Sequence, residues 1–204
     1  MGMKLEVCVG NYKEAIAAFK NGGDRIELCD NLQEGGTTPS YGTIKKSVCD
    51  IDIPINVIIR PRGGDFNYSD EEFEIMKEDI RICKELGLNG VVFGILNDDN
   101  TIDIERNKIL KEEAGNLSTT FHMAFDEIEN KNFAIDSLVD LGIDRILTKG
   151  GSTNAPNNLE KLKELVEYAG ERIIIMPGGG INANNREHIY NMTNAKELHG
   201  SKIV

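Results

Sequence analysis

The stretch Gly22-Gly23-Asp24-Arg25-Ile26-Glu27-Leu28-Cys29 holds a corner between a predicted helix and a predicted strand. Glycine is typical of a helix end because it takes the left-handed conformation without strain, and the apolar run that follows is typical of a strand. Residues 142–146 repeat the pattern Gly-x-Asp-Arg-Ile, and residues 87–91 carry a looser copy. Two explanations stay open: duplication of a half-barrel, or turn chemistry that recurs wherever a helix leads into a strand.

Outward from this corner, short β-branched runs alternate with longer helical patterns along the whole chain. Eight runs are predicted strands: Leu5–Val9, Arg25–Cys29, Ile55–Pro61, Gly90–Leu96, Thr119–Phe125, Arg145–Thr148, Arg172–Met176 and Glu197–Gly200. Their centres lie roughly 27 residues apart, close to the ~30 residues of one βαβ unit. Eight strands with seven intervening helices predict an α/β fold, the (β/α)8 TIM barrel, with its eighth helix short or missing. The alternative is an open, doubly wound parallel sheet.

Helix boundaries are marked between the predicted strands. Residues 69–72, Ser-Asp-Glu-Glu, form a capping box, in which a hydroxyl and a carboxylate satisfy each other's backbone donors. Glycines are placed to end four helices, at Gly22, Gly87, Gly142 and Gly170.

Composition excludes several classes of protein. The 204 residues carry 23 Lys and Arg against 34 Asp and Glu, a net charge of −11. An acidic surface repels phosphate backbones and anionic lipids, so we expect no nucleic-acid and no membrane partner. No linker or composition shift divides the chain, which predicts a single domain over residues 1–204. The first residues contain no signal-peptide pattern, and we expect a cytoplasmic protein with free thiols.

Charged and sulfur-bearing side chains alternate on the first two predicted strands. Glu6 and Cys8 lie two residues apart, as do Glu27 and Cys29, so each glutamate shares a strand face with its cysteine. If the strands are neighbours, two carboxylates and two thiols converge. Paired thiolates suit Cu(I), whereas the ordinary role of a free cysteine is to fill a core. Glu6 and Glu27 are catalytic candidates, or partners in ion pairs that only fill the barrel.

The third and fifth predicted strands carry further polar candidates. Arg60 and Arg62 share one face around Pro61 and form a candidate anion clamp, since arginine holds carboxylates and phosphates with two parallel bonds. His122 and Asp126 share a face if the fifth strand runs through both, which makes them candidate acid–base residues. A structural ion pair for Arg60 and a core position for His122 remain the alternatives.

Glycines follow the seventh and eighth predicted strands. Gly178, Gly179 and Gly180 let backbone N–H groups approach an anion, and Asn182 is placed to cap a following helix. After the eighth strand, Gly200 and Ser201 complete the loops where barrels hold phosphate, and His199 is a further candidate beside them. The alternative for the three glycines is a flexible hinge.

Taken together, these segments resemble the CutC family of copper homeostasis proteins over nearly the whole chain. The matching stretches are residues 6–9, 24–29, 35–42, 59–66, 68–72, 90–94, 120–122, 124–126 and 176–180. The resemblance implies a TIM barrel, a cytoplasmic setting and a homo-oligomer, a dimer or a tetramer. It also implies copper tolerance through Cu(I) binding, with Cys8 and Cys29 as the proposed ligands.

Two functional hypotheses follow. The first is a Cu(I)-binding copper homeostasis protein that uses Cys8 and Cys29. The second is an enzyme acting on a phosphorylated or carboxylated small molecule at the carboxyl-terminal mouth of the barrel. In it, Arg60, Arg62 and the glycine loop hold the anion, Glu27 or His122 moves a proton, and Asp126 or Glu6 adjusts its acidity. The residues alone favour the enzyme, and the resemblance favours copper.

Overall fold

The computed structural model describes residues 2–204, in which eight strands alternate with seven α-helices. The strands are β1 (Lys4–Val9), β2 (Arg25–Leu28), β3 (Ile55–Ile58), β4 (Gly90–Phe93), β5 (Ser118–Phe121), β6 (Arg145–Thr148), β7 (Ile174–Pro177) and β8 (Glu197–Gly200). The helices are α1 (Tyr12–Lys20), α2 (Tyr41–Asp50), α3 (Asp70–Glu85), α4 (Ile104–Ala114), α5 (Lys131–Asp140), α6 (Leu159–Ala169) and α7 (Arg186–Thr193). Three short 3-10 helices add to them: η1 (Leu32–Glu34), η2 (Met123–Glu127) and η3 (Ala155–Asn157).

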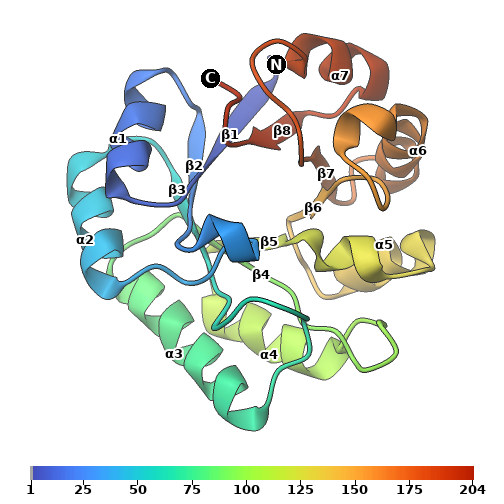
Figure 1. The fold of residues 1–204 in the computed structure, drawn as a ribbon. Coiled ribbons are helices and arrows are strands. Elements are labelled where there is room, and N and C mark those ends of the chain that lie inside the picture. Colours follow the sequence, from blue (N-terminus) through green and yellow to red (C-terminus); the bar gives the residue numbers. More distant parts are fainter. Residues whose placement is uncertain (1) are drawn as a thin grey trace.

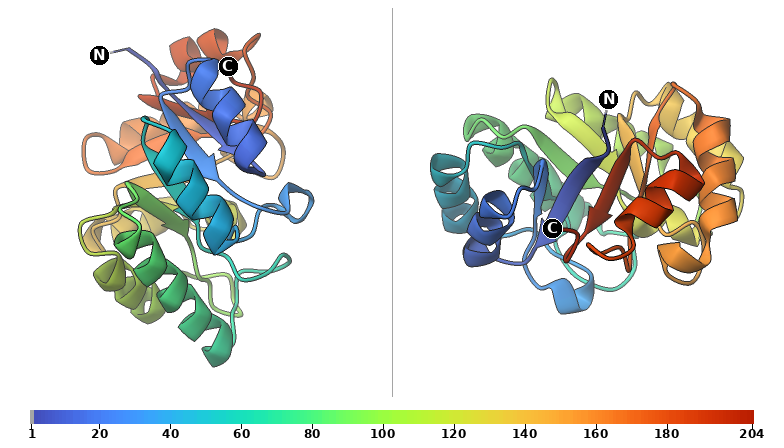
Figure 2. Two further views of the ribbon diagram at one scale, coloured as in Figure 1. Left: turned by 90° about the vertical axis from the view of Figure 1, so that its left-hand side faces the viewer. Right: turned by 90° about the horizontal axis from the view of Figure 1, so that it is seen from above.

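The strands form one parallel sheet in the order β7-β6-β5-β4-β3-β2-β1-β8. The helices surround it as an outer ring (Figure 1). β1 pairs with both β2 and β8, so the first and last strands lie side by side (Figure 2). Beyond the ends of β7 and β8, Asn182 and Lys202 form a parallel bridge across the remaining gap. The predicted (β/α)8 barrel is confirmed, and residues 201–204 after β8 contain no helix.

The helices form where the sequence signals place them. The capping box is present before α3: Ser69 Oγ accepts from the Glu72 backbone N–H at 3.2 Å, and Glu72 Oε2 accepts from the Ser69 N–H at 2.9 Å. Such a cap contributes about 1 kcal/mol. One face of α3 is buried along its length: Phe73, Met76, Ile80 and Cys83. No helix between residues 2 and 204 is long and apolar enough to cross a membrane.

Alternation along the strands separates two interiors. In β2, Ile26 and Leu28 belong to the apolar core between the strands and the helices. Arg25 and Glu27 occupy the other face and contact side chains of the strands across the barrel. The barrel therefore has an apolar outer core and a partly ionic centre, and the centre is where the candidate residues converge.

Four buried charges fill the amino-terminal half of the barrel. Arg25 pairs with Glu6 and, at 2.5 Å, with Glu197, which also pairs with Arg145 at 2.9 Å. Every one of these side chains is at most 8% exposed, a burial that charges tolerate only when they are paired. This layer closes one end of the barrel and leaves the carboxyl-terminal end open to a ligand.

The two Gly-x-Asp-Arg-Ile corners make equivalent contacts. Asp24 accepts from the Leu5 backbone N–H at 2.8 Å, and Asp144 accepts from the Thr119 N–H at 2.7 Å, so each aspartate anchors the start of the preceding strand. The two arginines of the pattern, Arg25 and Arg145, meet at the same carboxylate of Glu197. The four glycines predicted to end helices all have positive φ: Gly22, Gly87, Gly142 and Gly170.

Four predicted strands end earlier than expected. The second stops at Leu28 rather than Cys29, and the third stops at Ile58 rather than Pro61. The fourth stops at Phe93 rather than Leu96, and the fifth stops at Phe121 rather than Phe125. η2 follows β5 because the His122 ring accepts from the Ala124 backbone N–H and turns the chain. The period of two is lost at that turn, so the predicted shared face of His122 and Asp126 is wrong.

Candidate functional site

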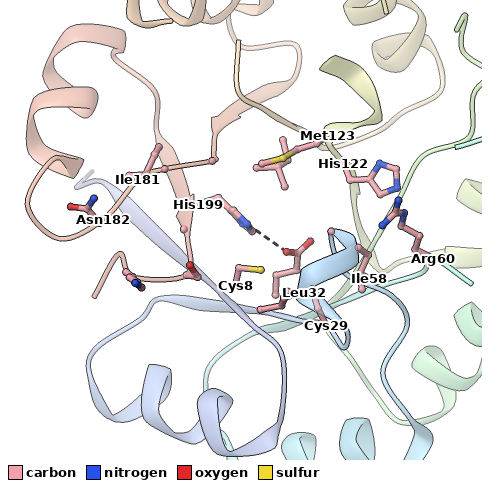
Figure 3. A pocket seen from close by; sticks show the side chains of 18 of the residues that line it. Cys8, Cys29, Leu32, Ile58, Arg60, His122, Met123, Ile181, Asn182 and His199 are labelled. Carbon is pink, nitrogen blue, oxygen red and sulfur yellow. Dashed lines mark ion pairs between the residues drawn. The ribbon is translucent and has the colours of Figure 1, made fainter. Parts of the chain in front are cut away.

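A cavity of about 440 Å³ opens among the loops at the carboxyl-terminal ends of the strands (Figure 3). Eleven of the residues singled out from the sequence line it: Cys8, Glu27, Cys29, Arg60, His122, Gly179, Gly180, Asn182, His199, Gly200 and Ser201. Apolar side chains make up much of the remaining wall: Leu32, Ile58, Phe66, Met123, Leu147 and Ile181. Glu6, Arg62, Asp126 and Gly178 do not line it, and their positions are described below.

Two thiols and a carboxyl group form one wall of the cavity. The β1–β2 register sets Cys8 opposite Glu27, and Cys29 follows directly after β2. One ligand atom from each of the three lies within 4.8 Å of the others. The predicted convergence of the two thiols is therefore seen, together with one of the two carboxyl groups.

The two thiols differ in acidity. The hydrogen bond from Cys29 outweighs burial and holds the pKa of the Cys8 thiol well below its usual value. The same hydrogen bond, with burial, raises the pKa of the Cys29 thiol. Burial is the main cause that raises the pKa of Glu27, with the Cys8 thiolate second. The wall therefore combines one thiol of lowered pKa, Cys8, with two groups of raised pKa, Cys29 and Glu27.

His199 lies between the thiol wall and the ionic layer below it. Its Nδ1 lies 2.8 Å from Glu6 Oε1, and its Nε2 lies 3.6 Å from Glu27 Oε2. Burial opposes a charge on the ring, but the carboxyl groups of Glu27 and Glu6 and the Cys8 sulfur raise the pKa of His199 well above its usual value. The dashed line that starts at the His199 ring in Figure 3 marks its ion pair with Glu27.

Glu6 lies below the cavity rather than in its wall. It is fully buried, with Arg25 on one carboxylate oxygen and His199 on the other. Burial alone raises its pKa, but the charge of Arg25 and the hydrogen bond of His199 lower the pKa of Glu6 to about 2. Glu6 thus stays ionised and holds the imidazole in place.

Arg60 lines the opposite side and is held by backbone oxygens. One terminal nitrogen donates to the carbonyls of Glu34 at 2.7 Å and Gly36 at 2.9 Å, and the other donates to that of Gly64 at 2.7 Å. Its guanidinium carbon lies 5.0 Å from the centre of the Phe66 ring. Arg60 therefore fixes two loops at the mouth of the barrel.

His122 packs against the same aromatic ring. The His122 and Phe66 ring centres are 4.9 Å apart, and His122 Nδ1 accepts from the Ala124 backbone N–H at 3.3 Å. Burial, and then the charge of Arg60, lower the pKa of His122 to about 3. A Cβ at position 94 would meet the imidazole at 2.8 Å, so Gly94 leaves room for the ring.

Arg62 and Asp126 lie outside the cavity. Arg62 pairs with Glu72 at 2.6 Å and Asp65 at 3.0 Å, and its side chain is 38% exposed. Asp126 accepts from Thr148 Oγ1 at 2.5 Å and from the Lys149 backbone N–H at 3.0 Å. The structure therefore does not join Arg62 to Arg60 in one clamp, and it does not place Asp126 beside His122.

The glycine loop contributes backbone rather than side chains. Gly179 and Gly180 have φ of +84° and +83°, a conformation that favours glycine. A Cβ at Gly178 would meet Leu147 at 2.5 Å. The expectation that Asn182 caps the next helix is wrong, because α7 begins only at Arg186 and Asn182 closes a turn by accepting from the Asn184 N–H.

Comparison with known proteins assigns the chain to a family. The model of the CutC family matches residues 3–204. The chain belongs to the CutC family. It is 46% identical over 200 residues to the human copper homeostasis protein cutC homolog, covering 98% of this chain and 73% of that protein.

Two bacterial relatives extend the CutC match. A CutC family protein of Enterococcus faecalis is 45% identical over 209 residues, covering 99% of this chain and all of that protein. A crystal structure of CutC from Streptococcus agalactiae superposes with a TM-score of 0.95 at 43% identity, covering 99% of this chain and 100% of that one. The resemblance noted in the sequence is therefore confirmed.

Three members of the ionic layer below the cavity were left out of the candidate set by sequence reasoning. Arg25 and Arg145 were assigned to a recurring turn, and Glu197 was not singled out. The available signal was the alternation of charged residues in Glu197-Leu198-His199, which places Glu197 and His199 on one strand face.

Proposed function

We propose that the protein binds Cu(I) as the cargo of a copper homeostasis function, with the thiols of Cys8 and Cys29 as ligands. The observation that carries the proposal is the cluster of Cys8, Cys29 and Glu27, with one ligand atom of each within 4.8 Å of the others. The names of the human and streptococcal relatives support the same function.

The donor set suits Cu(I) better than zinc. Thiolates are soft ligands, and Cu(I) accepts two-coordinate sites, whereas structural zinc takes four ligands. Of the residues within the described chain, the cluster offers two sulfurs and one carboxylate. Metal binding displaces the Cys29 proton, so two thiolates and one Cu(I) carry a net charge of −1. His199, which Glu6 holds in place, lies next to this negative charge.

The enzyme hypothesis is not favoured. It assigned acid–base roles to Glu6, Glu27, His122 and Asp126, and only Glu27 and His122 line the cavity. Glu6 is held in an ion pair, and Asp126 is bound to Thr148 and the Lys149 backbone. The relatives' names refer to copper homeostasis and to no reaction.

A cytoplasmic setting and self-association as a dimer or tetramer belong to the same proposal. A reducing compartment keeps Cys8 and Cys29 as free thiols, the state that binds Cu(I). Light scattering after size-exclusion chromatography tests the oligomer: a mass near 22.6 kDa identifies a monomer and removes that part of the proposal.

Anaerobic competition against a chromophoric Cu(I) chelator tests the metal site. We expect about one Cu(I) per chain of reduced protein, and loss of that binding in Cys8→Ser and Cys29→Ser. Cys49→Ser is the matched control, since Cys49 is an exposed thiol on α2, outside the cavity. Equal affinity in the wild type and the Cys8/Cys29 double variant removes the proposed site.

A further inference from the structure

The thiol wall occupies only part of the cavity. Two sulfurs and one carboxylate bind a single ion, which needs no enclosed space of about 440 Å³. Cavities of about 300–1,000 Å³ are the size that holds small organic ligands. The side away from Cys8, where Figure 3 shows Arg60 and His122, has no part in the copper proposal, and Phe66 packs against both of these side chains.

Arg60 is a buried cation without a counter-charge. Its residue is 4% exposed, and its three hydrogen bonds all go to neutral backbone carbonyls. Among residues 2–204, no carboxylate oxygen lies within the 4.0 Å of an ion pair with Arg60, although the ionic layer below pairs every one of its arginines. Its Nε–H has no protein partner. A buried charge is costly unless it is paired, so this position favours an anion.

His122 supplies a second unused donor beside it. The ring is neutral because burial and Arg60 lower its pKa to about 3, and its Nδ1 accepts from the Ala124 N–H. The proton of the neutral ring is therefore on Nε2, which is buried and has no protein partner. Both side chains lie against the Phe66 ring, at 5.0 Å for Arg60 and 4.9 Å for His122.

The rest of this side is apolar. Phe66, Ile58, Leu32 and Met123 belong to the lining of the same cavity, and Phe66 packs against both donor side chains. Such a surface desolvates the donors and accommodates a hydrocarbon body. The combination of one charge, two N–H groups without a protein partner and an apolar wall is the pattern of a site for a small organic anion.

We propose that Arg60 and His122 bind the carboxylate of a small organic acid. One carboxylate oxygen accepts from the Arg60 Nε–H, and the other accepts from the His122 Nε2–H. The apolar body of the acid lies toward Met123 and Ile58. A carboxylate fits better than a phosphate, because a single cation and two donors match one charge on two oxygens. In addition, α7 begins only at Arg186, so no helix start follows the glycine loop directly to help hold a phosphate. This site is separate from the thiol wall.

Butyrate is the probe, with butyramide as its neutral counterpart and inorganic phosphate as the third ligand. Binding is measured by saturation-transfer NMR and calorimetry on the full chain. We expect a butyrate Kd in the millimolar range and binding of butyramide weaker by about tenfold, since hydrogen bonds to charged groups are the stronger ones. Butyrate should also shift the His122 Nε2 resonance.

Variants separate this site from its surroundings. We expect His122→Phe, which keeps an aromatic ring on Phe66, to weaken butyrate by about fivefold or more. Arg60→Lys should weaken it further if the loops hold their structure. The matched control is Arg62→Gln, an arginine outside the cavity, which should bind butyrate like the wild type.

Cys8→Ser keeps the two tests distinguishable: it should lose Cu(I) and keep butyrate. Equal binding of butyrate and butyramide, tighter binding of phosphate than of butyrate, or wild-type affinity in His122→Phe each overturns the carboxylate site. None of these results bears on the copper proposal.

Discussion

His199 Nδ1 lies 2.8 Å from Glu6 Oε1, across the seam where the last strand pairs with the first. The β1–β8 register sets the two residues opposite each other, so the contact exists only when the barrel closes. The carboxylate orients the ring and directs Nε2 toward Glu27 and the thiol wall. Closure of the fold therefore brings His199 against the thiol wall, whose own residues are brought together by the pairing of β1 with β2.

Removing the Glu6 charge should destabilise the protein strongly. Glu6→Gln leaves Arg25 and His199 facing each other without the carboxylate that separates them, and breaking a buried pair typically costs about 3–5 kcal/mol. Urea unfolding measures the change. The control is Glu171→Gln, whose partner Lys196 is exposed, with an expected loss of about 0–1 kcal/mol. Similar losses in the two variants would show that the Glu6 pair does not hold the seam.

His122 should make the wild type sensitive to mild acid. The pKa of His122 is about 3 in the folded protein and about 6.5 in the unfolded chain. Between these two pH values the unfolded chain binds a proton at His122 and the folded protein does not. Stability from this group is full above pH 6.5 and is lost as the pH falls toward 3. Between pH 7.5 and pH 5 the loss is about 2 kcal/mol.

The comparison with His122→Phe isolates this contribution. Urea unfolding of both proteins at pH 7.5, 6 and 5 should show the variant gaining on the wild type as the pH falls. The two proteins differ at position 122 alone, so the comparison reports on that side chain. A stability difference that stays constant over this range contradicts a neutral, buried His122.

Position 178 should accept no side chain. A Cβ there meets Leu147 at 2.5 Å and His199 at 3.2 Å, and overpacking of this kind costs about 1–3 kcal/mol. We expect Gly178→Ala to lower the midpoint of thermal unfolding and to weaken Cu(I) binding by displacing His199. Gly42→Ala on α2 is the control, because its nearest contact is 4.0 Å away, and it should be neutral or stabilising. Wild-type copper affinity in Gly178→Ala would show that the position of His199 does not affect Cu(I) binding.

The barrel and its thiol wall could be predicted from the sequence because both depend on short periods. The spacing of strands and the alternation in Glu6-Val7-Cys8 are local patterns, and the structure places Cys8 and Cys29 in one wall as those patterns indicate. Position 122 shows the limit. η2 replaces the end of the predicted strand because the His122 ring accepts from the Ala124 backbone N–H. The alternation of apolar and polar residues does not predict such a side-chain hydrogen bond to the backbone.

The ionic layer could not be predicted, because its pairs are set by closure. Arg25 and Glu197 are 172 positions apart in the chain and meet only through the registers of β1 with β2 and β8. The predicted anion clamp of Arg60 and Arg62 was wrong for the opposite reason, because a local contact decides the position of Arg62. Arg62 pairs with Glu72, which is close in sequence and belongs to the capping box of α3.

Cys8 should be the reactive thiol of the cavity. The hydrogen bond from Cys29 keeps the pKa of Cys8 low, whereas burial raises the pKa of Cys83 to about 12. Since the thiolate is the nucleophile, iodoacetamide at pH 7 should modify Cys8 and leave Cys83 unmodified. Peptide mass spectrometry measures both rates in one sample.

Copper and His199 should each change the rate at Cys8. One equivalent of Cu(I) should protect Cys8, because coordination draws electron density from the sulfur and lowers its nucleophilicity. His199→Gln should slow the reaction, because the cationic ring that favours the Cys8 thiolate is gone. Lys202→Gln, on the cavity rim, controls for the general loss of a positive charge. Alkylation of Cys8 at an unchanged rate with bound Cu(I) would place the metal elsewhere, and an unchanged rate in His199→Gln would show that the ring does not sustain the thiolate.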